Sequence, residues 1–107
     1  LCTPASVDTI DSSNGQEDHV SMGANAAVKA LEVVENVETV LAIELLNAAQ
    51  GITLRGTEGM ASGVLKIFDA FRQTVPFVEA DREMYPLIAA SKQFMETYAL
   101  EPFARKD

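Results

Sequence analysis

Residues 40–49, with the sequence VLAIELLNAA, decide the fold, because only Glu44 and Asn47 interrupt a fully apolar stretch. A helix that is apolar on all sides is a buried helix, so this stretch predicts one that needs packing partners all around it. Apolar residues continue the pattern on one face at spacings of three, four and seven. They are Ala27, Leu31, Val34, Leu41, Leu45 and Ala48. We therefore predict one long helix over residues 21–50, ended by Gly51.

The predicted helix is too long for a chain of 107 residues to bury. At 1.5 Å per residue it measures about 45 Å, whereas a compact domain of this size has a radius of gyration of about 13 Å. Two further helices cannot cover its apolar half. We expect the missing partners to lie on other chains or on further sequence of the same protein. The start at Leu1, which is not an initiator methionine, agrees with a piece of a longer chain.

The rest of the sequence predicts two shorter helices after the long one and an irregular segment before it. Residues 1–20 have the small polar composition of a loop. A second helix is predicted over 57–75, since the residue before Pro76 avoids helical geometry. A third is predicted over 85–99, with Pro86 in its first turn. The residues expected to face a core are Met60, Val64, Ile67, Phe68, Phe71, Leu87, Ile88, Phe94, Met95 and Tyr98. No strand is indicated, so the predicted class is all-α.

Charge and composition exclude several functions. Sixteen acidic against eight basic residues give a formal net charge of −8, which argues against nucleic acid or an anionic membrane as partner. No uninterrupted apolar run reaches the roughly 18 residues of a membrane span, and no secretory signal is recognisable. Cys2 is the only cysteine, so an intrachain disulfide is impossible. We expect a cytoplasmic protein without a nucleic-acid or membrane partner.

The most polar segment, residues 12–19, contains the candidate functional side chains. Taken by itself, it is typical of a capped helix start, with Ser13 and Gln16 spaced as in a capping box and acids favoured by the helix dipole. Consecutive helical residues diverge, so Glu17 and its neighbours predict no metal site, and His19 has no second ligand of its kind. Glu44 inside its apolar stretch predicts a partner on a neighbouring helix, because an unpaired buried carboxylate is costly.

Three blocks of sequence resemble the histidine ammonia-lyases, within the aromatic amino acid lyase superfamily. They are CTPASVD at 2–8, SNGQEDHVSMG at 13–23 and LAIEL at 41–45. The resemblance implies the C-terminal part of a mostly helical chain of roughly 500 residues, which forms homotetramers around a central bundle of long helices. It also implies elimination of ammonia from L-histidine to give trans-urocanate. The implied cofactor is 4-methylideneimidazol-5-one (MIO), made from an Ala-Ser-Gly tripeptide elsewhere in the full chain.

The same resemblance implies that the loop over residues 1–20 and the helix start belong to an active site, and it assigns roles to two residues of the second block. Glu17 matches the family's active-site glutamate and is the expected catalytic residue, either as the base or as an anchor for the substrate imidazole. Physics leaves that choice open, because the helix dipole stabilises the carboxylate while desolvation favours its protonated form. Gln16 is the expected orienting neighbour. The tripeptide at 61–63 also reads Ala-Ser-Gly, but we interpret it as small-residue helix packing, and we expect the isolated chain to be inactive.

Two alternatives remain at this point. One is a tyrosine or phenylalanine ammonia-lyase, or an aminomutase, of the same superfamily. The other is an acidic helical oligomerisation module without catalysis, which composition alone permits. Upstream sequence that encodes an Ala-Ser-Gly loop would distinguish the lyases from the module, and a substrate assay of the full-length protein would distinguish the lyases from one another.

Overall fold

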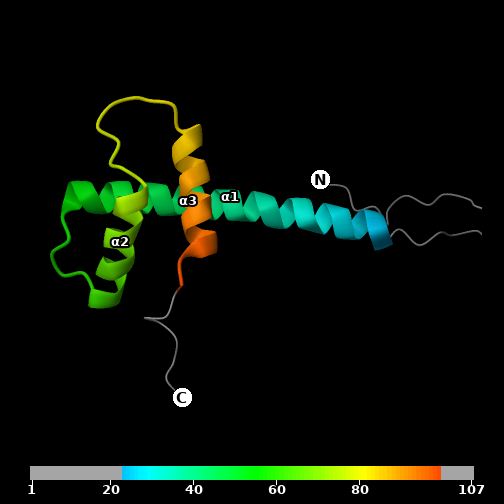
Figure 1. The fold of residues 1–107 in the computed structure, drawn as a ribbon, viewed down its shortest axis with the longest axis horizontal. Coiled ribbons are helices and arrows are strands. Elements are labelled where there is room, and N and C mark those ends of the chain that lie inside the picture. The colour runs from blue at the N-terminus through cyan, green and yellow to red at the C-terminus, as the bar shows by residue number, and fades with distance from the viewer. Residues whose placement is uncertain (1–22, 100–107) are drawn as a thin grey trace, which may run out of the picture. The chain divides into compact units, whose positions relative to one another are not determined.

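The computed structural model describes residues 23–99, and it confirms the all-α prediction. Three helices follow one another along the chain: α1 (Gly23–Arg55), α2 (Ser62–Thr74) and α3 (Tyr85–Thr97) (Figure 1). No strand occurs within residues 23–99. The chain divides into two units, Leu1–Val37 and Glu38–Asp107.

The long helix ends later than the sequence predicted. Gly51 lies inside α1, whose last residue is Arg55, so the predicted end at Gln50 is wrong by five residues. The terminating residue is Gly56, which has φ +96° and donates its N–H to the carbonyl of Ile52 at 2.8 Å. A left-handed residue after the last helical one is the usual way a helix closes, and glycine adopts it without a Cβ clash.

The second helix begins later than predicted, whereas the third begins at the predicted residue. Residues 57–60 form a turn instead of helix: the N–H of Met60 donates to the carbonyl of Thr57 at 3.2 Å, and Gly59 has φ +77°. The helix α2 stops at Thr74 because Val75, before the proline, is extended at φ −119° and ψ 112°. The helix α3 starts at Tyr85 with a proline in its first turn and ends at Thr97, two residues before the predicted end.

A small core joins the three helices in the unit that starts at Glu38. Its buried members come from α1, from α2 and the residue after it, and from α3. They are Leu46, Ala49, Phe71, Val75, Leu87 and Phe94. The Phe71 and Phe94 rings meet edge to face with centroids 5.3 Å apart, and Tyr98 stacks on Phe94 at 4.8 Å. Aromatic pairs of this kind contribute about 0.5–1.5 kcal/mol beyond the area they bury.

The face of α1 that enters this core lies beside the apolar stripe found in the sequence. Ala42, Leu46 and Ala49 are buried, whereas Leu41 is 44% exposed and Ala48 is exposed. The buried set is shifted by one position from the predicted stripe, which on a helix is a rotation of about 100°. In the unit that starts at Glu38, the packing of α2 and α3 therefore leaves most of the apolar stripe of α1 exposed.

The other unit, described from Gly23 to Val37, is a helical segment with large apolar side chains on its surface. Val28 is 61% exposed and Leu31 is 59% exposed. By length and composition alone, α1 could cross a membrane, although the sequence predicted no span. The core helix of a soluble protein passes the same test, so the finding is weak evidence for a membrane helix.

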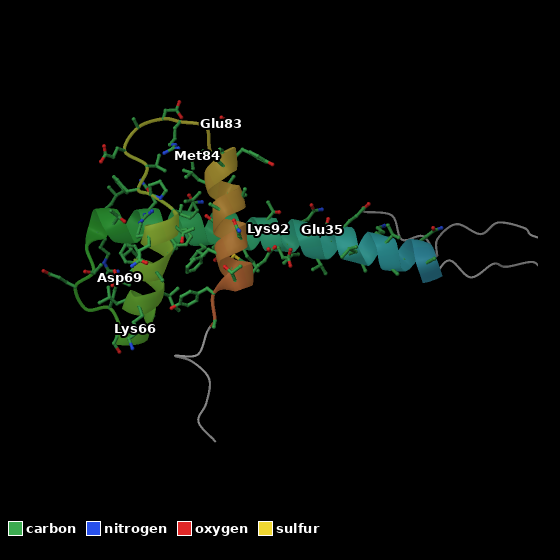
Figure 2. The ribbon with its side chains drawn as sticks, viewed as in Figure 1. Glu35, Lys66, Asp69, Glu83, Met84 and Lys92 are labelled. Carbon is green, nitrogen blue, oxygen red and sulfur yellow. The ribbon has the colours of Figure 1, made fainter. Side chains whose placement is uncertain are left out.

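The connection between α2 and α3 is fixed to the end of α1. The Gln50 amide donates to the Val78 carbonyl at 2.7 Å and accepts from the Val78 N–H at 3.2 Å. A half-buried ion pair joins α3 to α1, with Lys92 Nζ 3.2 Å from Glu38 Oε2. Figure 2 labels Lys92 on α3 and Glu83 on the connection. The two bonds between Gln50 and Val78 hold a segment that has no secondary structure of its own.

Candidate functional site

The residues predicted to carry chemistry lie outside the described part of the chain. Gln16, Glu17 and His19 all precede Gly23, where the description of α1 begins. Their roles therefore stay predictions. The described residues, 23–99, do test four other candidates: a metal site, a buried carboxylate at Glu44, the Ala-Ser-Gly tripeptide at 61–63, and a pocket that could bind a substrate.

Within residues 23–99 the structure shows no metal site, and the Glu44 carboxylate is not buried. Within residues 23–99 no group of three or more histidine, cysteine, aspartate or glutamate residues is placed to hold a metal ion. The Glu44 side chain is exposed, so the expected partner on a neighbouring helix is not required in this chain. An exposed carboxylate keeps its hydration and carries no desolvation cost.

The tripeptide Ala61-Ser62-Gly63 lies where α2 begins. Ala61 is the N-cap residue, and its carbonyl accepts a hydrogen bond from the N–H of Leu65 at 3.0 Å. Ser62 and Gly63 are the first two helical residues. Closing this tripeptide into a ring would remove the Ala61 carbonyl from the first turn of α2. Ala61 and Ser62 are exposed and Gly63 is half-buried, so the small-residue packing expected from the sequence is limited to Gly63.

A shallow apolar groove of about 170 Å³ lies between α1 and α2. Its lining is almost wholly apolar: Leu45, Ala48, Ala49, Ile52, Val64, Ile67, Phe68 and Phe71. A ligand site for a polar amino acid needs convergent polar groups that orient the substrate. This groove offers none, so it is not a candidate active site for such a substrate.

Arg72 on α2 makes four side-chain hydrogen bonds and lies near three aromatic rings, and the sequence pattern did not predict this role. Its Nε and Nη2 donate to Thr53 Oγ1 at 3.1 and 3.0 Å, and its Nη1 donates to the carbonyls of Val75 and Pro76 at 3.3 and 3.2 Å. The guanidinium carbon also lies 5.7–5.9 Å from three phenylalanine ring centroids, those of Phe68, Phe71 and Phe77.

These contacts make Arg72 a structural residue. Burial lowers the pKa of its guanidinium from the usual value, a direction that desolvation gives to any cation. Three of its nitrogens are already engaged within the chain, which leaves little capacity for a substrate carboxylate. The three phenylalanines at one, four and five residues from Arg72 in the sequence are the signal that could have predicted its contacts with aromatic rings.

Comparison with known proteins identifies the class. The family model for aromatic amino acid lyases matches residues 1–73. That match covers more than half of the chain and includes the block around Glu17. The chain belongs to the aromatic amino acid lyase family.

Within that family, its relatives are histidine ammonia-lyases. The chain is 52% identical over 101 residues to histidine ammonia-lyase from Anaeromyxobacter dehalogenans, covering 94% of this chain and 20% of that protein. It is 44% identical over 96 residues to the Staphylococcus aureus enzyme, covering 90% of this chain and 19% of that one. The crystal structure of histidine ammonia-lyase from Trypanosoma cruzi superposes with a TM-score of 0.85 at 39% identity, over 98% of this chain and 22% of that one. The chain thus spans about a fifth of the length of the curated relatives it matches.

Proposed function

We propose that this chain is the C-terminal part of a histidine ammonia-lyase, a carbon–nitrogen lyase that eliminates ammonia from L-histidine to give trans-urocanate. The observation that carries the proposal is the 52% identity to a histidine ammonia-lyase over 94% of the chain. Family membership alone would leave the substrate among several aromatic amino acids. Identity of this level to relatives that share one name favours histidine.

Glu17 is the residue of this chain that we assign to the chemistry. It precedes Gly23, the first described residue of α1, by six positions in the sequence. In the closed site Glu17 either takes the proton from the substrate carbon or accepts a hydrogen bond from the substrate imidazole. Gln16 is proposed to orient the substrate or the carboxylate through its amide, which can donate and accept at once.

The electrophile of the reaction is proposed to come from sequence outside this chain. The MIO group supplies an electron-poor centre that activates the substrate for loss of ammonia. The only Ala-Ser-Gly of this sequence is at 61–63, where the Ala61 carbonyl is engaged in the first turn of α2. We therefore assign this chain to binding and proton transfer and not to formation of the cofactor.

The complete enzyme is proposed to be a cytoplasmic homotetramer whose subunits meet along the long helix. Two observations support an interface there. In the unit that starts at Glu38, Leu41 is 44% exposed and Ile43 is 38% exposed, and the helix faces that carry them are not covered by α2 or α3. In the preceding unit, Leu31 and Val34 are more than half exposed. Burial of apolar area is worth about 25 cal/mol per Å², so such faces favour association.

The test is a pair of variants of the full-length enzyme assayed with L-histidine, L-tyrosine and L-phenylalanine. Glu17→Gln keeps the shape of the side chain and removes its charge, and we expect kcat/KM for histidine to fall at least about 100-fold, the scale of general-base or ionic assistance. Glu58→Gln makes the same chemical change at an exposed turn residue and should leave turnover unchanged.

The outcomes separate the proposal from its competitors. Turnover of tyrosine or phenylalanine in preference to histidine would overturn the substrate assignment. Normal turnover of Glu17→Gln together with a lowered melting temperature would make Glu17 a helix cap, whose loss costs about 1 kcal/mol or less. No turnover of any of the three substrates by the wild-type enzyme would favour a helical module without catalysis.

A further inference from the structure

We draw no further inference here: the strongest candidate, the apolar groove between α1 and α2 lined by Leu45, Ile52 and Phe68, carries nothing because nothing in the structure shows what covers it.

Discussion

Two glycines near the end of α1 should respond in opposite directions to the same substitution. Gly51 lies within the helix, and a Cβ built on it meets nothing within 4 Å. Alanine there should stabilise the folded chain by about 0.5–1 kcal/mol, the difference in helix propensity. Gly56 has equal space but φ +96°. Alanine there should destabilise by about 1–2 kcal/mol, the cost of left-handed backbone for a residue with a Cβ.

The measurement is thermal unfolding of the 107-residue chain and its two variants by far-ultraviolet circular dichroism. For a folded unit of this size, 1 kcal/mol moves the melting temperature by about 4–8 °C. We therefore expect Gly51→Ala to raise it by several degrees and Gly56→Ala to lower it by at least as much. Each variant is the control for the other, because both add one methyl group to an exposed glycine of the same segment.

One result would refute the reasoning directly. If Gly51→Ala lowered the melting temperature while Gly56→Ala left it unchanged, the helix would end at Gly51, as the sequence first predicted, and Gly56 would not be its left-handed terminator. Equal shifts of the same sign in both variants would contradict the opposite roles given to the two glycines.

Further predictions concern the α1–α2 contact, the isolated chain and its association. Arg72→Met keeps an unbranched side chain but removes the hydrogen bonds to Thr53 and to two carbonyls, so the free energy of unfolding should fall by about 1–3 kcal/mol. The control is Lys66→Met, at an exposed position of the same helix. An equal effect of both variants would contradict a specific role of the Arg72 hydrogen bonds. The isolated chain should form no urocanate from L-histidine, because catalysis requires the electrophile beside the bound substrate; formation by the rigorously purified chain would overturn its assignment to binding and proton transfer. Light scattering of the same chain should detect dimers or larger species, as exposed apolar faces favour association, and a monomer at high micromolar concentration would contradict this.

The number and class of the helices could be predicted from the sequence because they depend on local patterns. Apolar periodicity located all three, and prolines marked the end of α2 and the start of α3. The end of α1 was missed for a physical reason: Gly51 and Gly56 are both plausible terminators by residue type. Only the backbone conformation distinguishes them, and it depends on where the chain turns into the segment at 57–60.

The buried face of α1 was also beyond what periodicity can decide. A stretch that is apolar on every side permits several stripes at helical spacing, so the pattern identifies a buried helix without saying which neighbour covers which side. The packing of Phe71 and Phe94 selects the face with Leu46 and Ala49. The neighbouring phenylalanines could have indicated the ring contacts of Arg72, but its hydrogen bonds to Thr53 and to two main-chain carbonyls follow from no side-chain pattern.

The candidate site depends on a different kind of inference, since caps and acids in a helix start are common and do not by themselves indicate catalysis. The identity of the block that contains Gln16 and Glu17, and not its spacing, led to the lyase proposal. The described residues bear on two other candidate sites. Within residues 23–99 the acids form no metal cluster, and the apolar groove lacks polar groups that could orient an amino acid.

The helix α1 carries more apolar surface than α2 and α3 cover, and this excess agrees with the proposed oligomeric enzyme. The helices α2 and α3 bury only Ala42, Leu46 and Ala49 of this helix, and a chain that needed no other partner would be expected to carry polar residues on the remaining faces. The proposed homotetramer explains why these faces are apolar instead. The proposed catalytic residue Glu17 lies just before the same helix in the sequence. Under this proposal α1 carries the subunit interface and follows the proposed active-site segment in the sequence, so changes to the exposed apolar faces of α1 would be expected to affect assembly of the enzyme.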